Sequence, residues 1–475
     1  MKMKFVSTTL TVCMLSGLGF SGCSAGSQSS PAPASSDATS SGTVNLVVQD
    51  TPPSGITVLS FQVQIVSATL QPGSVSLVKN PVTVDLAQLV TDTSFLASQV
   101  VDSGTYTSLT MAYANPQITL MNSSSAPLVT PAGTCAVGQV CIFSPRINNA
   151  SLTISSGVFP ITVTASSSTG LNLDLSIPDL LQSDLSLTFA SGQSVNLSLL
   201  STLASLTDQQ SQLDAVLATV RSINGQQATI QTALGNQLTI GLNSGTTYSY
   251  PACPAANSSC LATGQIVDLN LSLLGDGSLV AQSVTYADAS GGAAARGTVL
   301  ATPSAGVDSF QILLHQVIPG ATSAASGTIV TIAPASGALF TVPFTGYPVV
   351  NGASFAGASD LVAGQEVLLQ LGAGSSTTNY NSGRIYLKPS QTIGTVQSVN
   401  AGGGSFILNG LTGLWTASKP TINQITCQAG SQTTYENLSS ASLGALSPGT
   451  AIAVKGLVFN SGGPILSTVI VRGRR

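Results

Sequence analysis

Apolar and polar residues alternate with a period of two along much of the chain after residue 41. The runs 61–65, 82–86 and 171–175 each place an apolar side chain at every second position. Successive side chains of a strand point to opposite faces, so these runs predict half-buried strands. Gly, Pro, Asn and Asp interrupt the runs at short intervals. The pattern therefore predicts an all-β protein and not alternating strands and helices.

Residues 42–190 hold the first series of these runs and predict an N-terminal β-sandwich. The stretch Val48 to Pro52, the segment Val84-Asp85-Leu86 and the later Gly104-Thr105-Tyr106 occur in this order. In this respect the region resembles the domain of unknown function 4382 found in exported bacterial proteins. The resemblance implies a sandwich similar to carbohydrate-binding folds, and it implies no catalytic residues.

Residues 191–216 join this region to the rest of the chain. Leu199, Leu203, Leu206 and Leu213 have partly helical spacing. The join is expected to be either a linker or one short helix, and the spacing does not decide between them.

A threefold repeat occupies 217–290, 294–390 and 392–473. The repeats open with Ala218-Thr219-Val220, Gly297-Thr298-Val299 and Gly394-Thr395-Val396. A second signature places Gly264, Gly364 and Gly449 at equivalent positions before an apolar strand. We expect each glycine to make a tight turn at the start of that strand. Each repeat is expected to form a small barrel or open sandwich of five or six strands.

The repeat region also resembles a known family over roughly residues 215–473. Its two signatures are similar to those of the domain of unknown function 5666. That family consists of small β-barrel-like modules that often occur in tandem in exported bacterial proteins. The resemblance implies a fold and no activity.

The first forty residues predict export and a lipid anchor. Lys2 and Lys4 precede an apolar stretch that ends in Phe20-Ser21-Gly22-Cys23. This resembles a bacterial lipobox, which predicts a signal peptide over 1–22 and lipidation of Cys23. Residues 23–41 are rich in Ser, Ala and Pro and predict a flexible tether. The alternative is an ordinary secretory signal with an incidental cysteine.

Cysteine spacing agrees with an oxidising compartment. Cys135 and Cys141 flank one short loop, and Cys253 and Cys260 flank another. Each pair predicts a local disulfide. Cys427 has no nearby partner in the sequence and is expected to be a buried small residue, since no basic residue stands close enough to stabilise a thiolate.

Composition excludes several classes of function. Charged residues make up 6% of the chain, with 13 Lys+Arg and 17 Asp+Glu. No basic stretch is large enough to neutralise several phosphates, which argues against nucleic-acid binding. The charges also lack the pattern of a coiled coil.

Few residues are available for catalysis or metal binding. His315 is the sole histidine and lies in an apolar run, so we expect a strand residue bonded to a backbone group and not a catalytic base. Glu366 and Glu436 lie in different repeats, which disfavours paired carboxylates for glycoside hydrolysis. We expect no metal and no cofactor. Trp415 is a candidate for stacking on a sugar, and core packing is the alternative.

These observations predict a non-enzymatic lipoprotein of the cell envelope, anchored at Cys23 and located at the outer membrane. Its partners beyond membrane lipid would be a glycan or an envelope protein, because Ser, Thr, Asn and Gln bind neutral groups without counter-charges. The alternative is a structural or assembly component that acts through strand-edge contacts.

Overall fold

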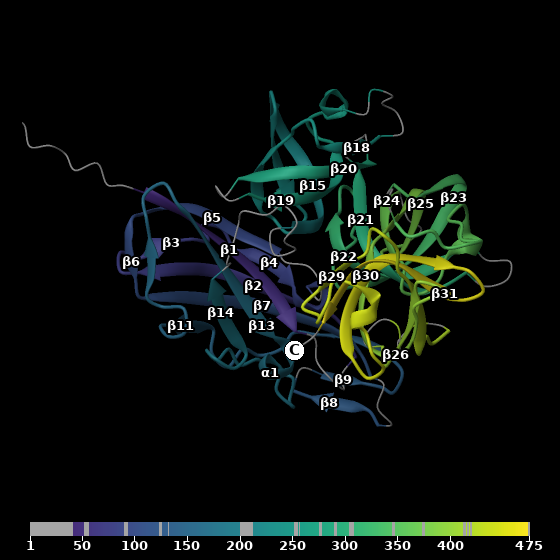
Figure 1. The fold of residues 1–475 in the computed structure, drawn as a ribbon, viewed down its shortest axis with the longest axis horizontal. Helices are drawn as coiled ribbons and strands as arrows, with labels where there is room; N and C mark the ends of the chain where they lie inside the picture. The colour runs from purple at the N-terminus through teal and green to yellow at the C-terminus, as the bar shows by residue number, and fades with distance from the viewer. Residues whose placement is uncertain are drawn as a thin grey trace, which may run out of the picture. The chain divides into compact units, whose positions relative to one another are not determined.

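The structure is a computed structural model that describes residues 41–473 except 52–56, 90–93, 123–125, 132, 200–211, 251–254, 256, 275–277, 289–291, 304–307, 344–346, 373–375, 412–414, 416–417 and 419. The predicted signal peptide and Cys23 lie outside the described residues, as does the predicted tether apart from Ser41. Strands dominate the described chain, which confirms the all-β prediction (Figure 1).

Two facing sheets form the N-terminal domain, defined here as residues 41–199. The first sheet has the order β14 (Val195–Leu199), β13 (Ser168–Ser176), β1 (Ser41–Thr51) and β5 (Ser94–Asp102). The second has the order β10 (Val140–Phe143), β7 (Ser108–Met121), β2 (Thr57–Gln71) and β3 (Val75–Ser76). Strands β11 (Ser151–Ile154) and β4 (Val82–Asp85) pair with β7 and β2. Alternate residues of both sheets enter one core, which includes Leu46, Leu171, Phe61 and Leu109.

Short elements complete this domain. Strand β6 (Gly104–Tyr106) pairs with β12 (Ile161–Val163), and β8 (Leu128–Thr130) pairs with β9 (Gly133–Cys135). The 3₁₀ turn η1 (Leu86–Gln88) follows β4, and helix α1 (Ile177–Leu180) follows β13. Pro178 stands near the start of α1, where its fixed φ favours the first turn.

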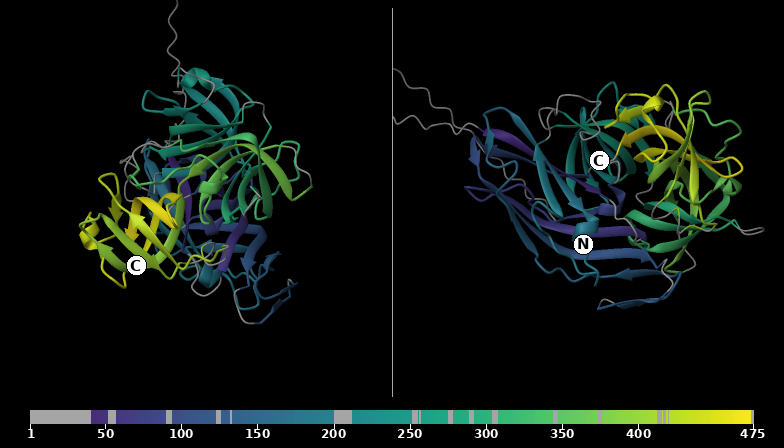
Figure 2. Two further views of the ribbon diagram at one scale, coloured as in Figure 1. Left: turned by 90° about the vertical axis from the view of Figure 1, so that its right-hand side faces the viewer. Right: turned by 60° about the horizontal axis from the view of Figure 1, so that its bottom comes forward.

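Three five-stranded rings follow, and Figure 2 shows them in teal, green and yellow. The first barrel contains β15 (Gln212–Asn224), β16 (Gln227–Thr232), β17 (Gln237–Gly241), β19 (Ile266–Leu273) and β20 (Leu279–Asp288), with β18 (Thr247–Ser249) added on β20. The second barrel contains β21 (Ala293–Ala301), β22 (Phe310–Ile318), β23 (Ile329–Thr341), β24 (Glu366–Leu371) and β25 (Asn379–Lys388). The third contains β26 (Ser390–Asn400), β27 (Ser405–Asn409), β28 (Gln424–Gln428), β30 (Ala451–Asn460) and β31 (Pro464–Gly473), with β29 (Thr434–Glu436) added on β31.

The barrels share one topology. In each ring the first strand pairs with the second and fourth, and the third strand closes the ring by running parallel to the fifth. The closing pairs are β17–β20, β23–β25 and β28–β31. This strand order is that of the OB-fold, a five-stranded Greek-key barrel. The predicted number of strands in each repeat is confirmed.

The repeat glycines make the predicted turn. Gly264, Gly364 and Gly449 have φ values of 89°, 88° and 89°, a region that glycine occupies without a Cβ penalty. Their amides donate to the carbonyls of Val220, Val299 and Val396 on the first strand of each barrel, at 2.8, 2.9 and 2.8 Å. A shared turn therefore fixes the start of the fourth strand in all three barrels.

The structure describes only the two ends of the join predicted over 191–216. Val195–Leu199 is strand β14 and Gln212 opens strand β15, so the described ends of the join are strands and not a helix. Leu213 is buried in the first barrel, whereas the Leu199 side chain is 49% exposed. The two leucines belong to separate sheets, and their spacing in the sequence was not that of one helical face.

Candidate functional site

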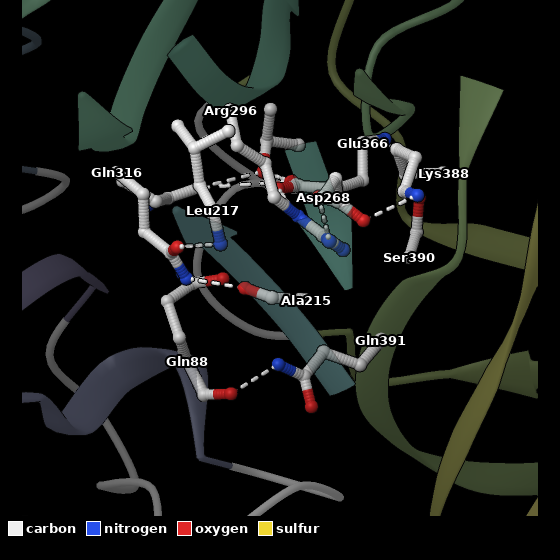
Figure 3. Close-up of polar contacts among 12 residues, drawn as sticks. Gln88, Ala215, Leu217, Asp268, Arg296, Gln316, Glu366, Lys388, Ser390 and Gln391 are labelled. Carbon is white, nitrogen blue, oxygen red and sulfur yellow. Dashed lines mark hydrogen bonds and ion pairs between the residues drawn. The ribbon is translucent and has the colours of Figure 1, made fainter. Parts of the chain in front are cut away.

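The densest group of charged side chains is buried where the first and second barrels meet (Figure 3). We call Asp268, Arg296, Glu366 and Lys388 the ionic network. Arg296 Nη1 lies 3.1 Å from Asp268 Oδ2, and Arg296 Nε lies 2.9 Å from Glu366 Oε1. Lys388 Nζ lies 2.5 Å from Asp268 Oδ1. Asp268 comes from β19 of the first barrel, and the other three come from the second.

The network is desolvated and internally paired. Asp268 and Lys388 are each 1% exposed. Burial by itself would raise the pKa of Asp268, but Lys388 and Arg296 outweigh it and hold that pKa below the ordinary value. A buried ion pair gives little net stability, but loss of one partner costs about 3–5 kcal/mol because the other charge stays buried. The network therefore specifies how the two barrels dock.

Thr298 and His315 extend the network within the second barrel. The Thr298 hydroxyl donates to Glu366 Oε2 at 2.5 Å and lies 2.8 Å from His315 Nε2. His315 is on β22, as predicted, but its partner is the Thr298 side chain and not the predicted backbone group. Strand β22 places His315 beside polar side chains of the junction, so its partner is a side-chain hydroxyl and not a backbone group.

A hydroxyl between an imidazole and a carboxylate resembles a nucleophile with its base. Thr298, His315 and Glu366 are 6%, 2% and 5% exposed. Glu366 Oε1 and Oε2 already accept from Arg296 and Thr298. All three side chains are thus enclosed within the junction between the first two barrels.

Neutral amides continue the junction beyond the charges. Gln316 on β22 accepts from the amide of Leu217 at 2.9 Å and donates to the carbonyl of Ala215 at 2.7 Å, both on β15 (Figure 3). Gln391 on β26 donates to the carbonyl of Gln88 in the N-terminal domain. An apolar cluster that includes Leu217, Leu368 and Tyr386 surrounds the contact between the first two barrels.

The sequence contained a signal for this network. The repeat signatures align Glu366 with Ile266 and Ala451, and Arg296 with Leu217 and Ile393. Charged residues thus occupy positions that are apolar in the sister repeats. Asp268 aligns with Leu368 and Ala453, so it is also charged where the sister repeats are apolar. Comparison of the repeats position by position would have singled out Asp268, Arg296 and Glu366.

Trp415 is placed in the core of the third barrel. Its side chain is 3% exposed and packs with Val362, Phe406 and Leu446. The ring also lies against the backbone of Gly364, where an added Cβ would stand 2.3 Å from Trp415 Cζ3. No ring face is open to a sugar, so the stacking candidate is replaced by its core-packing alternative.

The cysteines follow their predicted pattern where they are described. Cys135 and Cys141 form a disulfide with an S–S distance of 1.95 Å, which confirms that pair. Cys260 is disulfide-bonded, and its predicted partner Cys253 lies outside the described residues. Cys427 is free and fully buried, and burial raises the pKa of its thiol.

A cleft of about 610 Å³ lies between the N-terminal domain and the first barrel. One wall consists of the loop 77–80 with Val82 and β5 residues. The other wall consists of β16, β17 and β20 residues. Polar side chains at the cleft are mainly amides, namely Asn80, Gln99, Gln227, Asn236 and Gln237. Lys79 contributes the one charged side chain among the lining residues.

Two searches of the described residues gave negative results. They contain no group of three or more His, Cys, Asp or Glu side chains placed to hold a metal ion. They also contain no helix with the length and hydropathy needed to span a bilayer.

Comparison with family models confirms the first resemblance, and it confirms the second over the first of the three repeats. Residues 41–199 match the Domain of unknown function (DUF4382), and residues 218–285 match the Domain of unknown function (DUF5666). The second match covers the first barrel. No curated protein matches the chain.

Two solved structures align weakly with the chain. One is Drosophila Unr CSD456, with 11% identity and a TM-score of 0.13 over 55% of this chain and 97% of that one. The other is a multidomain protein with nucleic acid binding domains from Streptococcus pneumoniae, with 9% identity and a TM-score of 0.11 over 55% of this chain and 73% of that one. Our fold assignment rests on strand pairing and not on these alignments.

Proposed function

We propose that the protein is a lipid-anchored, non-enzymatic binding protein of the cell envelope, and that a neutral glycan chain binds in the cleft between the N-terminal domain and the first barrel. The observation that carries this proposal is the chemistry of the cleft. Its walls hold amide and apolar side chains, with no carboxylate among the lining residues.

This chemistry suits a sugar. The amides of Gln99, Gln227 and Gln237 can each donate to and accept from hydroxyl groups. Leu238 and Val280, which are partly exposed, offer apolar surface for the C–H faces of a pyranose ring. The volume of about 610 Å³ falls within the range of small-ligand sites.

The predicted anchor supports an envelope location. A lipidated Cys23 followed by the tether 23–41 would hold the binding domains near a membrane surface. The ionic network and the adjoining His315 support a non-enzymatic role, because together they hold the sole His and one of the two Glu residues of the chain within a buried junction.

A glycan-binding assay tests the proposal. Full-length protein is applied to an array of neutral and acidic oligosaccharides, and hits are measured by calorimetry. We expect binding to neutral glycans that falls at least about tenfold in the Gln227→Ala/Gln237→Ala double variant, the loss of two hydrogen bonds. Gln397→Ala, on an exposed position of β26 far from the cleft lining, is the matched control. Retention of no glycan would refute the proposal.

A second candidate function is assembly through strand addition at β14. This strand ends the first sheet, carries no charged residue over Val195–Leu199 and leaves Leu199 49% exposed. Charged residues commonly protect edge strands from pairing, and β14 lacks them. An envelope protein that co-purifies with the chain and is lost in Leu197→Pro would favour this function.

A further inference from the structure

A row of hydroxyl side chains crosses four strands of the second sheet in the N-terminal domain (Figure 1). These strands lie in the order β3, β2, β7 and β11, and their registers place in line Ser76, Thr69, Thr110 and Thr153. Leu109 and Met111, the neighbours of Thr110 along β7, are buried in the core of the domain. Because successive side chains of a strand alternate between its two faces, the row points away from that core.

A second row lies two residues further along the same strands. It consists of Ser67, Ala112 and Ser151. The pairing of β2 with β7 is continuous from Ser67 to Gln71, whereas three register shifts interrupt it before Ser67. Bulges bend a strand and increase its twist, so the two rows belong to the regular part of the sheet. We call the side chains of these two rows the hydroxyl face.

The hydroxyl face is open to solvent and equipped for hydrogen bonding. Ser76, Ser151 and Thr153 are exposed, and the other members are partly exposed. The hydroxyl oxygens of Thr110 and Thr153 lie 2.9 Å apart in a hydrogen bond. Two hydroxyl groups have two donors, and this bond uses one of them. Short side chains also lose less rotamer entropy than long charged ones when a ligand orders them.

Charge and composition define the class of partner. Strands β2, β3, β7 and β11 contain no Asp, Glu, Lys or Arg. A nucleic acid or an anionic membrane surface is bound through cations, and the core of a protein interface is enriched in aromatic residues, Met and Arg and depleted in Ser and Ala. The hydroxyl face offers hydroxyl groups and small aliphatic groups instead. These complement a neutral partner that is itself rich in hydroxyl groups.

The shape of the hydroxyl face defines the form of that partner. Neighbouring strands lie about 4.8 Å apart, and alternate residues of one strand lie about 6.8 Å apart, so the side chains repeat in two directions. Small-molecule sites are concave, whereas the hydroxyl face lies on the outer side of a sheet. A partner that contacts both rows on several strands at once must be extended and ordered.

We propose that the hydroxyl face binds the surface of an ordered, neutral polysaccharide with extended chains. This site is separate from the cleft, because the residues that line the cleft include no member of the hydroxyl face. The proposal goes beyond the proposed function. The cleft would hold a single glycan chain, whereas the hydroxyl face would lie flat against a packed polymer.

A pull-down with insoluble polysaccharides tests the proposal. Full-length protein is mixed with microcrystalline cellulose, chitin or mannan, and the bound fraction is measured over a range of protein concentrations. We expect the wild type to bind at least one polymer. Thr110→Lys and Ser151→Lys should each bind it at least about tenfold more weakly, because the added charge would lose water against a neutral surface without gaining a partner.

The control makes the same change outside the hydroxyl face. Thr162→Lys, at an exposed position of β12, should bind as the wild type does. Ser151 is exposed, so Ser151→Lys leaves the core intact even if Thr110→Lys disturbs the sheet, and circular dichroism checks the fold of each variant. Equal binding by Ser151→Lys and the wild type would overturn the proposal, as would the absence of binding to all three polymers.

Failure at the hydroxyl face can be distinguished from failure at the cleft. Gln227→Ala/Gln237→Ala changes the cleft and should retain binding to the insoluble polymer. Binding that is lost in this variant and kept in Ser151→Lys would refute the role of the hydroxyl face and leave the cleft as the site. Sedimentation adds one further outcome. A wild-type dimer that becomes a monomer in Ser151→Lys would assign the hydroxyl face to a second copy of the chain and contradict the proposal.

Discussion

Gly264, Gly364 and Gly449 have the same backbone conformation in three different surroundings. Their φ values agree within one degree, yet a Cβ added at Gly364 would overlap the Trp415 ring, whereas one added at Gly264 or Gly449 would meet no atom within 4 Å. Gly264 and Gly449 therefore serve as controls that separate the cost of backbone strain from the cost of steric overlap at Gly364.

We expect Gly264→Ala and Gly449→Ala each to cost about 1–2 kcal/mol, because an L-residue in the left-handed region is strained. Gly364→Ala should cost about 1–3 kcal/mol more, since the Trp415 ring must move. Thermal unfolding of the full chain, with Trp415 fluorescence as the probe, measures both effects. Equal losses of stability in the three variants would show that the Trp415 ring moves aside without a cost in free energy.

Cys23 is the residue on which the predicted anchor depends. In a bacterial host that processes lipoproteins, labelled palmitate should enter the wild-type protein and not Cys23→Ser, because the thiol is the acylation site. Cys13→Ser, within the predicted signal, is the matched control and should remain labelled. Label that persists in Cys23→Ser would contradict the prediction and place the acylation at another residue, whereas a wild-type protein without label would leave an ordinary secretory signal as the explanation.

At the scale of single elements, alternation in the sequence was sufficient to find strands and turn glycines. It left 191–216 undecided between a linker and a short helix, and the described ends of that join, with Leu199 and Leu213, are strands of separate sheets. Alternation also could not predict the order of the strands within each ring. The closing pair β17–β20 joins Ile240 to Leu279 and Gly241 to Val280 only, and such short parallel contacts leave no local pattern.

The Cys135–Cys141 disulfide stabilises the segment from β8 to β10. This segment exposes Val129, Val137 and Ile142 by 74%, 48% and 46%, and its buried apolar side chains among the described residues are Cys135 and Phe143. Closing so short a loop contributes about 2 kcal/mol in the chain-entropy model. In the Cys135→Ala/Cys141→Ala variant we expect faster hydrogen exchange over 128–143, with the barrels unaffected. Exchange that stayed as slow as in wild type would show that the pairing of β10 with β7 is sufficient.

At the scale of the whole molecule, the ionic network makes the docking of the first two barrels sensitive to acid, which weakens it. The folded-state pKa of Asp268 is depressed by Lys388 and Arg296. The stability it provides is therefore present above the ordinary carboxyl value, about pH 4, and is lost as the pH falls through the lower folded value.

Asp268→Asn should cost about 3–5 kcal/mol at pH 7, because two buried cations lose a counter-charge. It should also flatten the loss of stability in acid. Denaturant unfolding from pH 2 to 7 measures both, and Asp308→Asn, at an exposed carboxylate, is the control. A variant whose acid sensitivity equals that of wild type would assign that sensitivity to other carboxylates.

The sequence alone predicted the all-β fold class, the turn glycines and one complete disulfide, because these follow from local spacing. It did not predict that Asp268, Arg296, Glu366 and Lys388 meet, since they are brought together by docking of two barrels. Trp415 illustrates the same limit: its contact with Gly364 lies in another repeat.

The network also bears on how such a chain can evolve. Repeated modules can be duplicated, lost or exchanged by recombination, since each module forms its own closed barrel. Here the middle copy alone supplies Arg296, Glu366 and Lys388, and its predecessor alone supplies Asp268. A recombination event that deleted or reordered the modules would leave charges buried without partners. The docking of the first two modules therefore depends on their order along the chain, even though each module folds to the same plan.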